Sequence, residues 1–234
     1  MFSRIPFLAG ALLIGASAIA HASDEDQCAV GSGEGAVAAC SEIITETKGP
    51  DVAWAYFNRG RAYFNAKMYG SAIADLTDVL RFKPDDADAV ENRGLAFLAM
   101  ADYGRALSDF DKAIALRPTW ASGYRGRCSA RAAANRDLDD AVRDCNMALS
   151  LQAGDAGAFD ARCLVWVRKA IYRAAIADCK AALNINPMLA SSLYLLGVAK
   201  IRTGDLAHGD ADISTARAMD PDVISIFVMY GIKP

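Results

Sequence analysis

Small and apolar residues recur along most of this chain at intervals of about 34 residues. The clearest copy of the pattern runs from Ala87 to Trp120. Its small, aromatic and proline positions are Gly94, Phe97, Ala106, Phe110, Ala113 and Pro118. Residues three and four apart share one face of a helix, small residues let two helices approach, and a proline ends a helix. The pattern therefore predicts a helix-turn-helix unit.

The same unit can be followed through five copies. A small residue marks the start of each second helix and steps by 34, 35, 34 and 34 residues, at Ala72, Ala106, Ala141, Ala175 and Gly209. The predicted repeats span residues 53–86, 87–120, 121–155, 156–189 and 190–223. The single extra residue in the third copy falls in the turn at 135–137. A fixed period of this length predicts a stack of repeats whose neighbours share one core.

Both ends of the array carry incomplete units. Residues 34–47 match the second half of a repeat and predict a helix that ends before Gly49-Pro50. Cys28 is then expected on a short or irregular stretch that covers the first complete helix. Residues 222–232 predict a capping helix, with Ile224, Phe227 and Val228 on its packing face.

The repeats resemble those of the tetratricopeptide repeat (TPR) family, over nearly all of residues 23–234. The segments 58–60 and 92–94, both Asn-Arg-Gly, and the Ala-Ile-Ala-Asp segments 72–75 and 175–178 look like the repeats of exported bacterial members. The resemblance implies an all-α, right-handed superhelical solenoid of antiparallel helix pairs, forming a single domain. It also implies a concave face that binds peptides or proteins.

In this family, five positions of each first helix look into the concave face. Here the resemblance places the binding residues at Trp54, Phe57, Arg61, Phe64, Glu91, Leu95, Leu98, Arg125, Leu164, Val167, Tyr194 and Val198, with Asp160 on the same face. The aromatic group of Trp54, Phe57 and Phe64 supports two interpretations. It either anchors a ligand or packs on the N-terminal half-repeat as core.

An arginine and an aspartate also follow the repeat period. The arginine stands at the seventh position of four repeats, at Arg59, Arg93, Arg127 and Arg162. The aspartate stands at the twenty-third position of all five, at Asp75, Asp109, Asp144, Asp178 and Asp212. Because the seventh position faces the helix packing, an arginine there needs a carboxylate partner. We expect ion pairs within the repeats; the alternative is an arginine that binds a ligand.

The six cysteines are an even number without a CxxC motif, which favours disulfides over a zinc or thioredoxin-like site. Cys128 and Cys163 occupy the eighth position of their repeats, opposite Cys145 and Cys179 on the second helices. We therefore predict the pairs Cys128–Cys145 and Cys163–Cys179, which leaves Cys28–Cys40. A Cys145–Cys163 bridge between repeats is the alternative, and unpaired buried cysteines are another.

The N-terminus predicts export. One arginine, an apolar run and the segment Ala20-His21-Ala22 are typical of a signal peptide covering residues 1–22. A retained membrane anchor is the alternative interpretation. We expect a periplasmic or secreted protein with no stable membrane insertion after cleavage.

Composition argues for a binding protein. The net charge of −3 gives no basic excess for nucleic acid. Removal of His21 leaves His208, too few histidines for acid-base catalysis or a multi-histidine metal site. We therefore expect a non-catalytic scaffold, without a cofactor or metal, that binds a protein or peptide segment. The alternatives are self-association through the apolar C-terminal cap, giving a homo-oligomer, and a thiol-based enzyme.

Overall fold

The computed structural model describes residues 24–31 and 33–233, and every regular element in these ranges is helical. The predicted signal peptide lies outside the described residues. Residues 24–30 are helical, so the stretch that carries Cys28 is short but not irregular. The elements that follow are α2 (Gly33–Glu46), the 3-10 helix η1 (Pro50–Val52), α3 (Ala53–Asn65), α4 (Tyr69–Phe82), α5 (Ala87–Ala99), α6 (Tyr103–Leu116), α7 (Ala121–Ala133), α8 (Leu138–Leu151), α9 (Ala156–Arg168), α10 (Tyr172–Ile185), α11 (Ala190–Arg202), α12 (Leu206–Met219) and α13 (Val223–Met229).

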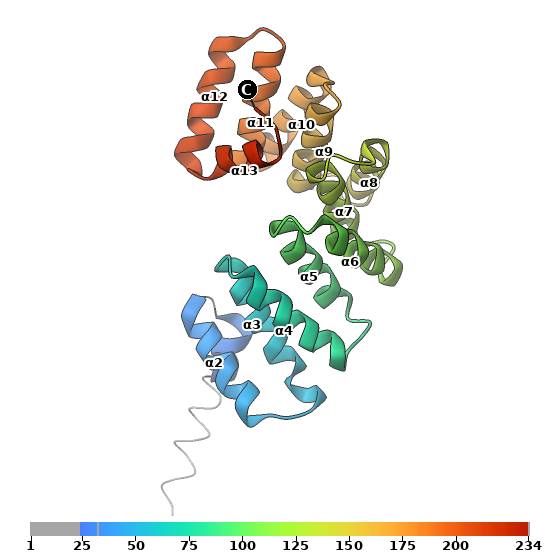
Figure 1. Ribbon diagram of the computed structural model, residues 1–234, viewed down its shortest axis with the longest axis vertical. Coiled ribbons are helices and arrows are strands. Elements are labelled where there is room, and N and C mark those ends of the chain that lie inside the picture. The colour runs from blue at the N-terminus through green and yellow to red at the C-terminus, as the bar shows by residue number, and fades with distance from the viewer. Residues whose placement is uncertain (1–23, 32, 234) are drawn as a thin grey trace, which may run out of the picture. The chain divides into compact units, whose positions relative to one another are not determined.

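Each predicted repeat is one pair of antiparallel helices (Figure 1). The pairs are α3 with α4, α5 with α6, α7 with α8, α9 with α10, and α11 with α12, and the two members of every pair pack against each other. In every repeat the first helix begins at the alanine that opens the predicted unit. This arrangement confirms an all-α fold of consecutive helix pairs.

The chain divides into two compact units, residues up to Pro84 and residues from Asp85 onward. The first unit holds α2, α3 and α4 around a core that includes Cys40, Ile43 and Val52. The second unit holds α5 to α13. The single domain expected from the sequence stays a prediction; because all repeats share one turn pattern, the period carries no mark of this boundary.

The second helix of each repeat is amphipathic, which explains why the two helices of a pair pack together. In α6 the buried residues are Ala106, Asp109, Phe110 and Ala113, a spacing of three, four and seven positions that forms one stripe. The helix starts at an Asp102 cap, whose side chain accepts a hydrogen bond from the Arg105 N–H. Small residues in the stripe allow close packing, and an aspartate lies within it.

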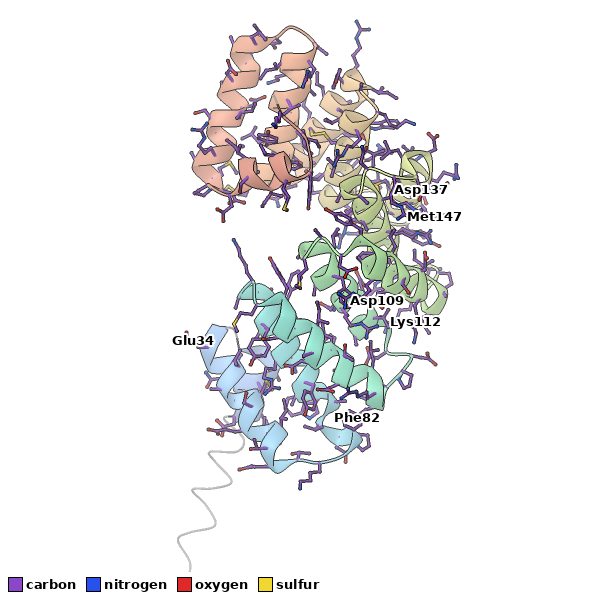
Figure 2. All side chains as sticks on the ribbon, viewed as in Figure 1. Glu34, Phe82, Asp109, Lys112, Asp137 and Met147 are labelled. Atoms are coloured by element: carbon purple, nitrogen blue, oxygen red, sulfur yellow. A yellow bond between two sulfur atoms is a disulfide. The ribbon has the colours of Figure 1, made fainter. Side chains whose placement is uncertain are left out.

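The turns inside the pairs have a common backbone feature. Their residues Lys67, Ala101, Asn135 and Ala170 have φ between 52° and 58°, and Gly204 has φ 94°. These five residues occupy the same position of their repeats. The third repeat adds a second left-handed residue, Asp137, between α7 and α8 (Figure 2), which is where the extra residue was predicted.

The C-terminal cap is shorter than predicted. α13 ends at Met229, and the chain then turns at Gly231, whose φ is 74°. Val223, Phe227 and Ile232 are buried, whereas Val228 is 42% exposed. The helical spacing grouped Val228 with Ile224 and Phe227, whereas the buried residues of α13 are Val223 and Phe227.

Candidate functional site

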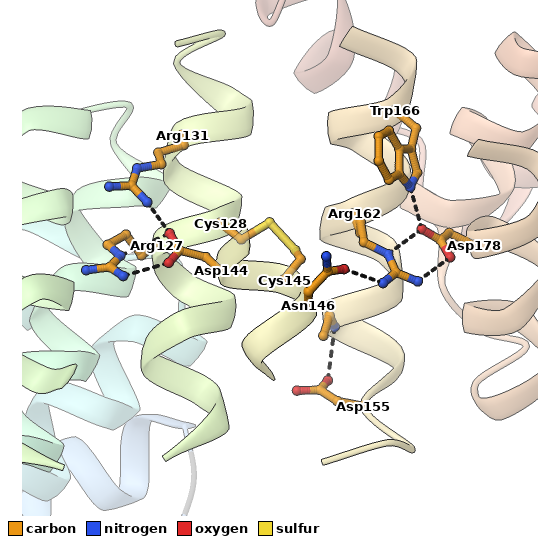
Figure 3. Close-up of a disulfide and its surroundings, with 11 residues drawn as sticks. Arg127, Cys128, Arg131, Asp144, Cys145, Asn146, Asp155, Arg162, Trp166 and Asp178 are labelled. Carbon is orange, nitrogen blue, oxygen red and sulfur yellow. Dashed lines mark hydrogen bonds and ion pairs between the residues drawn. A yellow bond between two sulfur atoms is a disulfide. The ribbon is translucent and has the colours of Figure 1, made fainter. Parts of the chain in front are cut away.

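The periodic arginines and aspartates form ion pairs inside the repeats, as predicted. Arg59 donates to Asp75 through Nε and Nη2, both at 2.8 Å. Arg162 donates to both oxygens of Asp178, at 2.7 and 2.8 Å, and Trp166 Nε1 donates to the same carboxylate (Figure 3). The arginines at 93 and 127 pair with Asp109 and Asp144 in the same way. These guanidinium groups are therefore engaged in the fold, not offered to a ligand.

The fifth repeat replaces the arginine by Leu196, and its aspartate uses another cation. Lys200 Nζ lies 2.6 Å from Asp212 Oδ2. Lys200 stands one helical turn after Leu196 on α11, so it reaches the same carboxylate position. All five periodic aspartates thus have a basic partner within their own repeat.

The cysteines form the three pairs that the repeat positions indicated. Cys128–Cys145 and Cys163–Cys179 each join the two helices of one repeat, with Cα atoms 5.6 and 5.5 Å apart. Cys28–Cys40 ties residues 24–30 to α2, with Cα atoms 4.8 Å apart. All six residues are buried. These bridges account for all of the described cysteines.

In the first unit, the predicted aromatic residues on α3 do not behave alike. Trp54 packs against the buried core around Cys40 and Ile43, which favours its interpretation as core. Phe57 and Phe64 are half-buried, and Phe64 meets Tyr69 edge to face with ring centroids 5.4 Å apart. Arg61 is exposed, and its guanidinium lies 5.9 Å from the centre of the Phe57 ring.

In the second unit, the first helices of four repeats line an open pocket of about 420 Å³. Leu98 of α5 and Leu164 of α9 reach it, as the resemblance implied. Leu95 is half-buried on α5 and does not line this pocket. Further wall residues, which sequence reasoning did not place there, come from the α10–α11 connection, the end of α12 and the C-terminal cap: Met188, Met219, Asp220, Val223, Ile226, Phe227 and Tyr230.

Two of the predicted groove residues are covered by the C-terminal segment. Tyr194 is 0% exposed: its ring stacks on Phe227, with centroids 4.9 Å apart, and its hydroxyl donates to the Ile232 carbonyl at 3.2 Å. Val198 is 1% exposed. Val167 is also buried. In this structure Tyr194 and Val198 therefore offer little surface to a ligand, and their role in ligand binding stays a prediction.

Arg125 and Glu91, the polar residues predicted for the groove in the second and third repeats, interact mainly with other residues of the fold. Arg125 Nη1 donates to both oxygens of Asp155, at 3.1 and 3.0 Å. Asp155 in turn caps α9 by accepting the Ala158 N–H. Glu91 is buried, and burial raises its pKa, against the opposing effects of the Ser122 hydroxyl and the Arg125 charge. Arg125 therefore stabilises the start of α9 more than it serves a ligand.

Asp160 on α9 lies inside the 420 Å³ pocket and differs from every aspartate above. Its Oδ1 accepts hydrogen bonds from the hydroxyls of Ser191, at 3.0 Å, and Ser192, at 2.5 Å. Burial raises its pKa, and the two hydroxyls oppose this shift. Among the described residues, no lysine, arginine or histidine pairs with it. The two serines open the fifth repeat, next to the fourth along the stack, a proximity that the repeat spacing could have indicated.

The last features to place are His208, possible metal sites and possible membrane-spanning helices. His208, predicted to be a surface or packing residue, is exposed on α12, where its Nδ1 lies 2.7 Å from Asp205 Oδ1. Within the described ranges, the acidic, cysteine and histidine residues form no group suited to hold a metal ion. Over the same ranges, no helix has both the length and the apolar character needed to cross a membrane.

Comparison with known proteins supports the interpretation of the repeats. Residues 55–86 and 87–119 match the family described as Tetratricopeptide repeat. TTC0263, a thermophilic TPR protein in Thermus thermophilus, is 20% identical over 76% of this chain and 97% of that chain, with a TM-score of 0.66. A tetratricopeptide repeat protein from Parabacteroides merdae is 18% identical over 84% of this chain and 76% of that chain, with a TM-score of 0.68.

A third similar structure is YrrB, described as a TPR protein with an unusual peptide-binding site. It is 17% identical over 81% of this chain and 96% of that chain, with a TM-score of 0.52. At these identities the likenesses show a common fold. No curated protein matches the sequence.

Proposed function

We propose that this tetratricopeptide-repeat protein is a non-catalytic scaffold, exported from the cell, that binds a segment of another protein along its first helices. The observation that carries the proposal is the 420 Å³ pocket, because it is formed jointly by the first helices of consecutive repeats and the cap. A pocket of this size, mostly apolar with a few polar groups, suits a side chain or short segment of a partner. The TPR family consists mainly of scaffolds for protein interaction, which agrees with this role.

The proposal names no substrate because the described chemistry offers little for catalysis. The periodic arginines are held by aspartates, the cysteines are in disulfides, and His208 lies on the surface beside one carboxylate. These groups stabilise the repeats. A binding surface on a disulfide-tied scaffold also suits an oxidising compartment outside the cytoplasm.

A pocket-filling substitution tests the binding role. Ser129 lines the pocket and is half-buried, so Ser129→Tyr places a ring in the space that a partner would occupy. Ser108→Tyr, on the exposed face of α6, adds the same ring elsewhere. We expect a tagged Ser129→Tyr protein to lose partners that the unaltered protein captures from the exported fraction, and Ser108→Tyr to retain them. Equal capture by all three proteins, each with an unchanged circular dichroism spectrum, would place binding outside the pocket.

Export is tested separately by intact mass. Protein produced in a bacterium and recovered outside the cytoplasm should lack residues 1–22, with Ser23 as its first residue. A protein that keeps these residues and stays with the membrane fraction would instead support a retained anchor.

Self-association is a second candidate function, favoured by the exposed apolar residues of the cap. Ile226 is 38% exposed, Val228 42% and Met229 66%. Clustered apolar residues at the open end of a repeat stack can bury against a second copy. Light scattering after size exclusion decides this: a dimer lost in Met229→Glu supports self-association, and a monomer at all concentrations rejects it. Phe227, being buried, is unsuitable for this test because its substitution would disturb the cap itself.

A further inference from the structure

The charged residues that line the 420 Å³ pocket are all acidic. Asp160 comes from α9 and Asp220 follows α12, whereas no lysine, arginine or histidine is among the lining residues. By contrast, Asp155 at the start of α9 has Arg125 as a basic partner. A pocket that concentrates negative charge without an internal cation is electrostatically complementary to a positively charged group.

The hydrogen bonds of Asp160 leave one oxygen available. Both serine hydroxyls donate to Oδ1, at 3.0 and 2.5 Å, and they fix the orientation of the carboxylate. Oδ2 accepts no hydrogen bond from the described residues. Asp160 is half-buried and lines the pocket. An ionised carboxylate oxygen without a donor can accept a charge-assisted hydrogen bond from a cation that enters the pocket.

The rest of the pocket suits the stem of a long side chain. Leu98, Leu164 and Phe227 give apolar contacts, and Tyr230 adds a second aromatic ring. Met188, which is 74% exposed at the rim, is a flexible side chain that adapts to different neighbours. Lysine and arginine combine a long apolar stem with a charged head, so they match an apolar channel that ends at a carboxylate.

We propose that this pocket binds a basic side chain of a partner segment, with its charged head on Asp160 and its stem between Leu164 and the cap helix α13. The site deepens the proposed scaffold function and rests on it, because it names the chemistry that the pocket selects. Asp160 acts as the specificity-determining residue. Ser191 and Ser192 act as positioning residues, since their hydroxyls hold the orientation of the carboxylate.

A small probe tests the site without knowledge of the partner. Pentylammonium has the stem and charge of a lysine side chain, and 1-pentanol has the same shape without the charge. We expect pentylammonium, titrated into the isotope-labelled protein, to shift the backbone amide signals of residues 160, 191 and 192 and to saturate at millimolar concentrations. Pentanol should bind at least about tenfold more weakly, since it leaves the carboxylate without a cation.

Matched variants separate the site from general charge effects. Asp160→Asn keeps the shape and an oxygen for the serine hydroxyls but removes the charge. Asp210→Asn removes one charge from an exposed position of α12. We expect Asp160→Asn to lose the preference for pentylammonium over pentanol and Asp210→Asn to retain it. No saturation, equal binding of the two probes, or an unchanged preference in Asp160→Asn would overturn the proposal.

A second pair of probes identifies the source of the positive charge. N-acetyl-lysine amide carries it on a side chain, whereas leucine amide carries it on the terminal amine of a residue. Tighter binding of N-acetyl-lysine amide supports the proposal, and tighter binding of leucine amide would show that the pocket takes a chain terminus instead. If partner capture depends on Ser129 but not on Asp160, this inference fails and the scaffold function stands. If the probes bind and no partner is captured, the scaffold function fails and the cation site stands.

Discussion

Arg93 donates two parallel hydrogen bonds to Asp109, from Nε to Oδ2 at 2.9 Å and from Nη2 to Oδ1 at 2.8 Å. The pair joins α5 to α6, and the Asp109 side chain is only 8% exposed. A bidentate contact fixes both the distance and the orientation of the two helices. The same contact in three other repeats makes it the common polar joint of these helix pairs.

Removing Arg93 should show how much free energy it costs to keep Asp109 buried without a cation. We expect Arg93→Ala to lower the free energy of unfolding by about 3 kcal/mol, because Asp109 is left buried without a counter-charge. The double variant Arg93→Ala/Asp109→Ala should recover part of this loss. Urea denaturation measures both variants. Arg81→Ala, which breaks an exposed contact with Asp78, is the control and should cost less than about 1 kcal/mol.

The left-handed turn residues predict stabilising substitutions. Ala101 and Ala170 have φ of 58° and 57°, a region that costs a residue with a side chain roughly 1–2 kcal/mol, whereas Gly204 fills the same position of the fifth repeat. Ala101→Gly and Ala170→Gly should each raise the free energy of unfolding by about 0.5–1 kcal/mol after the entropic cost of glycine is subtracted. Gly204→Ala should lower it. A loss of stability in both Ala101→Gly and Ala170→Gly would show that the turns differ in solution.

The disulfides predict a measurable loss on removal. Cys163 and Cys179 are 16 residues apart, and Cys128 and Cys145 are 17 apart. Closing loops of this size should contribute about 3 kcal/mol each. We therefore expect Cys163→Ala/Cys179→Ala to unfold at lower urea concentration, and a reducing agent to have less effect on it than on the unaltered protein. Peptide mapping without reduction checks the pairs directly, and a Cys145–Cys163 peptide would contradict them.

The repeat period accounts for what the sequence could predict. Helix positions, the ion pairs and the disulfide partners depend on contacts within one repeat, so the 34-residue spacing places them. The cover over Tyr194 and the lack of a cation at Asp160 depend on other elements. Tyr194 meets the cap helix, which is not a repeat, and Asp160 meets serines of the following repeat. A pattern that describes an average repeat shows that the fourth and fifth repeats are neighbours, but it does not say which side chains meet or what covers them.

The boundary near Pro84 was hidden for a related reason. Proline follows the second helix at Pro84, Pro118, Pro187 and Pro221, so Pro84 looks like the other repeat ends. Local rules end a helix at each of these positions and do not rank the packing that follows. The division into two units became apparent only from the contacts between helices.

Asp160 predicts an unusual dependence of stability on pH. Its pKa is raised in the folded protein, so the folded state holds the proton more tightly than the unfolded state does. The ionised carboxylate therefore destabilises the fold above this pKa, and the effect disappears as pH falls below the unfolded value of about 3.9. Ser191 and Ser192 face the group, and Asp220 and Tyr230 line the same pocket.

We expect Asp160→Asn to be more stable than the unaltered protein at pH 7 by up to roughly 1 kcal/mol, the low end of the cost of an imperfectly satisfied polar group, because Asp160 is half-buried. The difference should shrink as pH is lowered toward about 4, near the unfolded pKa of an aspartate. Urea denaturation at several pH values measures it, with Asp210→Asn as the control for an exposed charge. A variant that is less stable than the unaltered protein at pH 7 would show that the carboxylate has a favourable partner in solution.

The stacked rings of Tyr194 and Phe227 predict how the cap is held. α13 has seven residues, too few to form a stable helix alone, so its order depends on packing against α11. Phe227→Ala removes the stacked ring and should cost about 3 kcal/mol of local stability, enough to release the segment without unfolding the repeats. Hydrogen exchange at residues 223–233 should then accelerate by roughly a hundredfold, while α7 and α9 keep their protection. Met229→Ala, at an exposed position of the same helix, should leave exchange nearly unchanged.

Since Phe227 and Tyr230 also form a wall of the pocket, the released variant should bind pentylammonium more weakly even though Asp160 remains in place. Unchanged exchange in Phe227→Ala would mean that the hydrogen bond from Tyr194 to Ile232 and the burial of Val223 are enough to hold the cap.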